Sequence, residues 1–388
     1  MLLEKFVPWL FQQLHSGKQF LLPAFLVTLL VGCARPPINP STSSSLPSNS
    51  ATSSTAQTST AKAKTTEVAV VRDPVLDGIL LRQERIYRIA APLIIKNAVL
   101  CKTQARPLLG FTAKNQYSYP PELQAVARQS LGLDERLQVM QILDGSGAMR
   151  AGLKRGDILQ SIQDLALPTG AQAEPEAARM LSPLLKNLTE IKITVIRQSQ
   201  PITVNVPLTL ACAFAIDVGN AQHLNAYADG RRIMLTRGLL DWLSADEEVS
   251  VIIAREMAHN VLQHARQLQQ TATLSGVIDS LLAFKPDANA FSASNGIKIL
   301  PEKMDQEADR LALFMLARAN YDPTNFSRVM QRIAQAPNTS QANSYQSFHP
   351  WTEERQKLIQ STLKEIKQKQ SSKKRSFLNF LKTNSSVG

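Results

Sequence analysis

The spacing of apolar residues changes twice along the chain. No other feature of the sequence restricts the possible folds as strongly as these two changes. From Asp73 to Leu100, apolar residues recur at helical spacing, which predicts a helix. Residues 102–211 instead form short alternating runs separated by glycine turns, as in a β-rich domain. Helical spacing returns beyond residue 212. The sequence therefore predicts an α+β protein in which a β-rich domain interrupts a mainly helical domain with a small sheet.

The N-terminal residues, 1–33, are predicted to be a targeting segment. Lys5 and Lys18 precede an apolar run of about 11 residues, which is too short to cross a bilayer that needs about 20 but suits a signal peptide. The run ends in Leu30-Val31-Gly32-Cys33, which resembles the bacterial lipobox. This resemblance implies lipidation of Cys33. An ordinary signal peptide or a buried helix with an incidental Cys33 remains the alternative.

Residues 34–72 are predicted to be a flexible tether. Between Ser41 and Thr66, 16 of 26 residues are Ser or Thr, and such a stretch buries too little apolar surface to fold. In lipoproteins an Asp after the lipidated Cys often signals retention at the inner membrane, and here Ala34 follows instead. We therefore expect a bacterial envelope protein, anchored by lipid to the periplasmic face of the outer membrane.

The net charge of +12 is concentrated at the C-terminus rather than on a nucleic-acid-binding motif. Residues 363–388 form a predicted basic tail, and Lys364–Lys382 contains seven Lys or Arg residues and one acid, which is about half of the net charge. The tail is either a solvated terminus or a segment that docks on anionic lipid. No nucleic-acid partner is expected.

Two cysteines remain if Cys33 is lipidated. In an oxidising envelope compartment Cys101 and Cys212 would pair by parity, and the bridge would join the entry and exit of the β-rich domain. Two buried thiols are the alternative.

Two motifs in the β-rich segment resemble PDZ domains. Leu108-Leu109-Gly110-Phe111 is similar to their carboxylate-binding loop, and Ala151-Gly152-Leu153-Lys154-Arg155-Gly156-Asp157 is similar to a second PDZ stretch. The resemblance implies a PDZ-like domain over residues 102–211, with Leu109, Gly110 and Phe111 binding a peptide. A structural β-domain without a ligand is the alternative.

Three later motifs share the order and spacing of a known family. They are Arg255-Glu256-Met257-Ala258-His259 on a helix that follows a predicted Ser244–Glu247 capping box, Asp305-Gln306-Glu307-Ala308-Asp309, and Phe348-His349-Pro350 continuing to Arg355. They resemble the zinc metallopeptidases that include HtpX, BepA, Oma and the CAAX prenyl proteases. The resemblance implies a zincin-like domain made of residues 73–101 and 212–362.

The same resemblance implies one zinc ion and proteolytic activity. His259 matches one metal ligand, and Glu256 matches the general base. Asp305 stands where the family has a ligand Glu, a carboxylate one methylene longer, and Asp309 lies beside them. Arg255, however, stands where the family has its first ligand His, and a guanidinium has no lone pair for a metal.

Two interpretations of Arg255 remain open. In the first, its guanidinium takes the place of the cation and pairs with Asp305 or Asp309. In the second, His259, Asp305 and His349 form a substitute set of ligands, with Glu256 as the base.

The predicted strand Ile233–Thr236 supplies the last candidate site. In the family the equivalent sheet edge pairs with an extended substrate, so Ile233 and Leu235 are candidate peptide-binding residues; a covered core strand is the alternative. The predicted function is a membrane-anchored periplasmic zinc metalloendopeptidase-like protein, acting on unfolded or misassembled envelope proteins or peptides in quality control. The alternative is an inactive pseudopeptidase that serves as a peptide-binding or chaperone-like scaffold.

Overall fold

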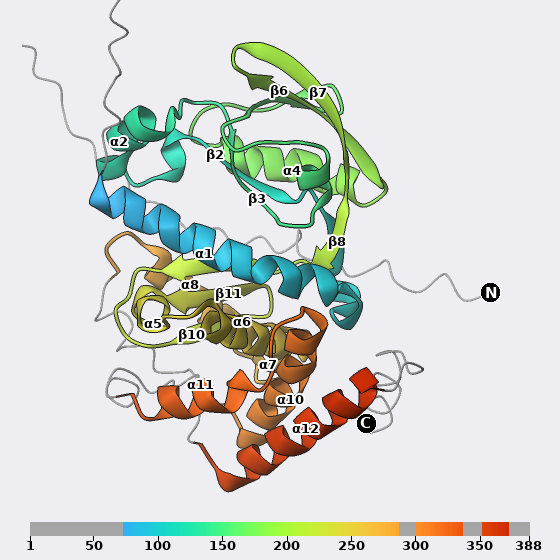
Figure 1. The fold of residues 1–388 in the computed structure, drawn as a ribbon. Helices are drawn as coiled ribbons and strands as arrows, with labels where there is room; N and C mark the ends of the chain where they lie inside the picture. Colours follow the sequence, from blue (N-terminus) through green and yellow to red (C-terminus); the bar gives the residue numbers. More distant parts are fainter. Residues whose placement is uncertain (1–72, 287–299, 337–350, 372–388) are drawn as a thin grey trace, which may run out of the picture. The chain divides into compact units, whose positions relative to one another are not determined.

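The computed structural model describes residues 73–286, 300–336 and 351–371 (Figure 1). Cys33, His349, the predicted signal peptide and the predicted tether lie outside these residues. The predicted α+β fold class is confirmed, with a β-rich part between the two cysteines and a mainly helical part around a small sheet.

The β-rich part contains a six-stranded sheet and three α-helices. Its sheet has the order β2-β3-β4-β6-β7, with the short β5 paired to β4. The elements are β2 (Phe111–Lys114), α2 (Pro121–Leu131), β3 (Gln138–Ile142), α3 (Gly147–Arg150), β4 (Ile158–Ile162), β5 (Leu165–Ala166), α4 (Ala173–Leu185), β6 (Glu190–Arg197) and β7 (Gln200–Pro207). Strands β6 and β7 form a hairpin, since they pair antiparallel along their whole length. Alternate residues of β6, Ile191, Ile193 and Val195, are fully buried, as expected of a strand with one face on a core.

A two-stranded ribbon connects the β-rich part to the rest of the chain. It consists of β1 (Ala105–Leu108) and β8 (Thr209–Cys212), which pair antiparallel. Cys101 and Cys212 form a disulfide with a Cα–Cα distance of 5.6 Å. The predicted pairing therefore joins the chain where it enters the β-rich part to the chain where it leaves.

The helical part contains a three-stranded sheet with the order β10-β11-β9. The strands are β9 (Ala215–Gly219), β10 (Ala226–Ala228) and β11 (Arg232–Thr236). Since β11 pairs with β10 on one side and with β9 on the other, it has no free edge. The prediction that Ile233 and Leu235 pair with a substrate is therefore wrong, and both side chains are fully buried. Strand β11 is a covered core strand, which is the alternative given above.

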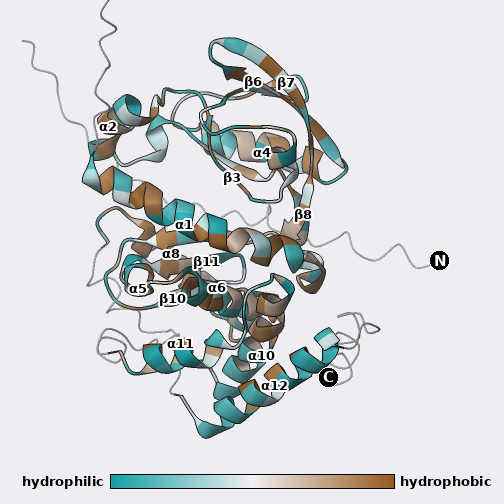
Figure 2. Ribbon diagram, in the orientation of Figure 1, coloured by the Kyte–Doolittle hydropathy of each residue, from teal (hydrophilic) through white to brown (hydrophobic). Residues whose placement is uncertain are grey.

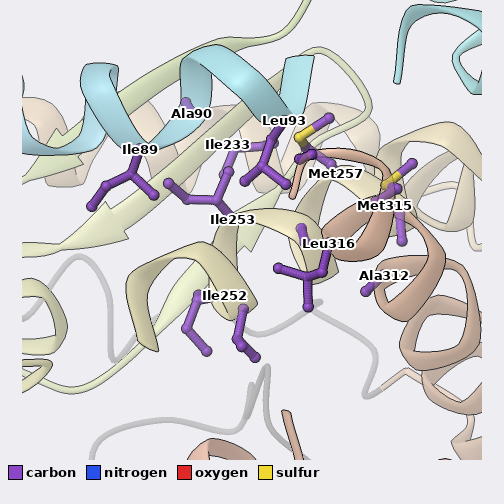
Figure 3. Close-up of a cluster of buried hydrophobic side chains, with 14 of the residues drawn as sticks. Ile89, Ala90, Leu93, Ile233, Ile252, Ile253, Met257, Ala312, Met315 and Leu316 are labelled. Atoms are coloured by element: carbon purple, nitrogen blue, oxygen red, sulfur yellow. The ribbon is translucent and has the colours of Figure 1, made fainter. Parts of the chain in front are cut away.

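Helix α6 (Asp246–Val261) lies at the centre of the helical part. It packs against α1 (Pro74–Lys96), α10 (Glu302–Arg318) and α11 (Asn325–Ala334). Figure 3 shows part of this core, where Ile253 and Met257 of α6 lie near Leu93 of α1 and Leu316 of α10. The remaining helices are α5 (Arg237–Trp242), α7 (His264–Gln267), α8 (Thr271–Leu282) and α12 (Glu353–Ser371).

The N-terminus of α6 differs by one residue from the predicted capping box. The helix begins at Asp246, and the backbone N–H of Ala245 donates to the side chain of Glu248 at 3.4 Å. The predicted reciprocal pair of Ser244 and Glu247 is therefore wrong. Glu248 is almost fully buried and also accepts hydrogen bonds from Arg328 and Arg332, which compensates for its burial.

Helix α12 continues past the predicted start of the basic tail. Figure 2 shows that hydrophilic residues dominate this helix, but Ile366 is buried in the core and Glu365 forms an ion pair with Arg310 at 2.7 Å. Residues 363–371 therefore belong to the folded domain. No helix of the described part is long and apolar enough to cross a membrane.

Candidate functional site

The predicted site residues of the helical part come together where α6 crosses α10. Arg255 and His259 are four residues apart on α6, and Asp305 and Asp309 are four residues apart on α10, so each pair shares one helix face. Together with Glu256, all five side chains are at least 97% buried. The spacing seen in the sequence thus places a dense group of charges inside the protein.

Arg255 is the centre of this group. Its three guanidinium nitrogens each donate to a different carboxylate: Nη1 to Glu256 at 2.9 Å, Nη2 to Asp305 at 2.7 Å and Nε to Asp309 at 3.3 Å. Such charge-assisted hydrogen bonds are among the strongest in proteins. Both carboxylates that were predicted as alternative partners of Arg255 therefore contact it at once.

A second buried arginine completes the arrangement. Arg355 of α12 is fully buried, and its Nε and Nη2 lie 2.8 Å and 2.7 Å from Oδ2 of Asp309. Asp309 thus accepts from Arg255 through one oxygen and from Arg355 through the other. Sequence reasoning did not select Arg355 as a site residue, although its place at the end of the His349-Pro350 motif was a usable signal.

His264 also belongs to the site, as a neighbour of His259. Helix α6 ends at Val261, and Gln263 has a positive φ of 59°, so the chain turns back before α7. His264 is therefore 99% buried, and its Nδ1 lies 2.9 Å from Nδ1 of His259. Its other ring nitrogen lies 3.5 Å from the carboxylate of Glu307.

Burial controls the protonation of these groups. It raises the pKa of Glu256 to about 7, because Asp305 and Asp309 add to the effect of burial while Arg255 opposes it only in part. Burial and the neighbouring Arg255 hold the pKa of His259 well below its usual value, so this imidazole is neutral. The site therefore contains a neutral imidazole, two permanent cations and three carboxylates that compete for them.

The arrangement does not fit a zinc ion. A hydrolytic zinc site needs three protein ligands and an open position for water. Here Asp305 and Glu256 are bonded to Arg255, while His259 Nδ1 faces His264 and its Nε2 lies 3.6 Å from Asp305. Across the described ranges, no group of three or more His, Cys, Asp or Glu side chains is positioned to hold a metal ion.

The predicted peptide-binding loop lies apart from these charges, at the edge of the six-stranded sheet. Gly110 has a φ of 82°, and its carbonyl accepts from Leu143 N at 2.8 Å and from Ser146 Oγ at 3.2 Å. A Cβ at this position would lie 2.6 Å from Cβ of Ser146, so only glycine fits. Leu109, Gly110 and Phe111 all line a cavity of about 760 Å³.

Comparison with known proteins agrees with the motifs of the helical part. Residues 190–363 match the model of peptidase family M48. The mitochondrial metalloendopeptidase OMA1 of Arabidopsis thaliana is 31% identical over 147 residues, which are 37% of this chain and 30% of that protein. The beta-barrel assembly-enhancing protease of Yersinia pestis is 26% identical over 131 residues, which are 30% of this chain and 27% of that protein. The chain thus matches less than half of the length of these relatives.

Solved structures of HtrA-type proteases share a smaller part of the chain. The HtrA-type protease AlgW with a decapeptide is 25% identical over 27% of this chain and 30% of that chain, with a TM-score of 0.21. The HtrA3 PDZ domain bound to a phage-derived ligand is 13% identical over 27% of this chain and 88% of that chain, also with a TM-score of 0.21.

Proposed function

We propose that this protein, whose residues 190–363 match the model of peptidase family M48, binds unfolded or misassembled polypeptides of the bacterial envelope without cleaving them. Its predicted lipid anchor at Cys33 and its Ser/Thr-rich tether would hold it at the periplasmic face of the outer membrane. Peptides would bind at Leu109, Gly110 and Phe111 of the β-rich part.

One observation carries the proposal that the protein does not cleave peptides. The guanidinium of Arg255 lies within 3.3 Å of Asp305 and Glu256, which the resemblance implies as ligand and base, and of the neighbouring Asp309. Arginine remains protonated at any physiological pH and offers no lone pair to a metal. A site closed in this way has neither a metal ligand set nor a free base.

A zinc endopeptidase is the second candidate, and the family match favours it. The relatives named above are metalloendopeptidases or proteases by name, and Glu256 and His259 match the family motif. His349 would then have to join His259 and Asp305 as a ligand.

Zinc content separates the two candidates. The purified full-length chain should contain much less than one zinc per molecule by elemental analysis and should leave casein intact, while it suppresses the aggregation of a denatured substrate protein. Arg255→His should raise zinc occupancy. Stoichiometric zinc with casein cleavage that Glu256→Gln abolishes would establish the endopeptidase instead.

The anchor is tested separately in cells. Cys33→Ser should move the protein from the outer-membrane fraction to the soluble periplasmic fraction. If both forms fractionate alike, the proposed lipid anchor is wrong.

A further inference from the structure

The cavity beside the peptide-binding loop has walls from both parts of the protein. One side is formed by β2 and α4 of the β-rich part, and the other by α1 and β9 of the helical part. Its volume of about 760 Å³ lies within the range of roughly 300–1,000 Å³ that is common for ligand sites. A ligand that fills this space must touch both parts.

The cavity offers the groups that an extended peptide needs. Strand β2 is an edge of the six-stranded sheet, so its outer side can receive an added strand. In the part of the chain that the structure describes, the backbone N–H groups of Leu109 and Gly110 donate to no acceptor. Two cations with no ion-pair partner among the described residues, Arg106 and Lys186, also line the cavity. Two open N–H groups and two cations suit a terminal carboxylate.

Helix α1 contributes a continuous face to the same cavity. Leu80, Gln83, Glu84 and Tyr87 line it, and their spacing of three, four and seven residues places them on one side of the helix. Glu84 lies 3.9 Å from Arg155 of the β-rich part, across the boundary between the two parts. The neighbouring Leu81 is 67% exposed and does not line the cavity.

We propose that α1 is a specificity-determining wall of the peptide site, so that a peptide paired with β2 is also held by the helical part. The ligand is an extended segment with apolar side chains and a free C-terminal carboxylate, which lies between β2, α4 and α1. This inference rests on the proposed peptide-binding function but not on the state of the buried charge group. If the groove of the β-rich part were open on this side, the peptide would contact β2 and α4 but not α1.

The test measures the binding of a labelled peptide to variants of the full-length chain. The probe is a fluorescein-labelled decapeptide with alternating apolar residues and a C-terminal Phe, followed by fluorescence polarisation. Glu84→Trp fills the cavity from the side of α1 and should weaken binding at least tenfold. Leu81→Trp adds the same bulk on another side of the same helix and should change the Kd less than twofold. Glu84→Gln removes the charge without adding bulk and should stay within threefold.

Two further measurements separate this inference from the proposed function. Leu185→Asp on α4 should abolish binding, and amidation of the peptide C-terminus should weaken it at least fivefold. If Leu185→Asp abolishes binding while Glu84→Trp stays within twofold of the unmodified chain, the peptide binds without α1 and the inference is overturned. An equal loss in Leu81→Trp would also overturn it. If the unmodified chain binds no peptide, the proposed function fails first.

Discussion

Replacing Arg255 by methionine tests whether this guanidinium holds the buried carboxylates in place of a metal. Methionine has a similar length but carries no charge, so Glu256 and Asp305 would lose the guanidinium that they contact, while Asp309 would keep its pair with Arg355. Removal of one partner from a buried ion pair typically costs about 3–5 kcal/mol. Since Arg255 is fully buried and donates to three carboxylates, we expect a loss at the upper end of this range.

Urea unfolding followed by far-UV circular dichroism measures the effect. With a slope of about 3 kcal/mol per molar urea, Arg255→Met should lower the midpoint by roughly 1–2 M. Arg82→Met is the matched control, because Arg82 pairs with Asp241 at the surface, where such pairs contribute less than about 1 kcal/mol. Adding Asp305→Asn to Arg255→Met should recover part of the loss, since it removes one uncompensated carboxylate.

If Arg255→Met unfolds within about 1 kcal/mol of the Arg82→Met control, the carboxylates do not depend on Arg255. The guanidinium would then not be the internal cation of the site, and the argument against hydrolysis would lose its basis. A variant that gains stability would lead to the same conclusion.

Three further predictions concern pH, the disulfide and the peptide loop. Burial raises the pKa of Glu256 from 4.5 to about 7. The contribution of Glu256 to the free energy of unfolding is therefore fully present below pH 4.5 and is lost as the pH rises through 7. In urea titrations, the free energy of unfolding of the unmodified chain, relative to Glu256→Gln, should fall by roughly 3 kcal/mol between these two pH values. The disulfide closes a sequence separation of 111 residues, so Cys101→Ser with Cys212→Ser should lower the free energy of unfolding by about 4–5 kcal/mol, and reductant should affect only the unmodified chain. Gly110→Ala should destabilise the fold by about 1–3 kcal/mol and reduce peptide binding, whereas Gly132→Ala, with a φ of 67° and no atom within 4 Å of the new Cβ, should leave peptide binding unchanged.

Local patterns in the sequence were sufficient for most of the elements. The helix predicted from Asp73 and the strands expected between residues 102 and 211 are found, because apolar spacing reports directly on which face a segment buries. The pairing of Arg255 with Asp305 and Asp309 is one of the two interpretations that the motif left open. The residues of the helix and of the strands are close in sequence, whereas Arg255 meets Asp305 and Asp309 across two helices.

Features that depend on a single turn or on the order of strands in a sheet could not be predicted from the sequence. The turn at Gln263 brings His264 back to His259, although continuous helical spacing would have put the two about 140° apart. The family resemblance implies that β11 is a sheet edge, but β11 pairs with β9, whose residues precede it by about 17 positions. Neither a single left-handed residue nor the order of strands in a sheet leaves a periodic signal in the sequence.

Arg255 and Asp305, the two residues that depart from the family motif, form one structural unit. An arginine side chain is longer than that of histidine, and an aspartate is one methylene shorter than the glutamate of the motif. With Asp305 rather than Glu on α10, the guanidinium of Arg255 reaches its carboxylate at 2.7 Å inside a core that has no exposed atoms at either residue. Close packing leaves little room for an extra methylene at such a contact, since overpacking typically costs about 1–3 kcal/mol. The shorter acid and the longer base therefore fit each other, and the resulting ion pair engages the carboxylate that the resemblance implies as a metal ligand.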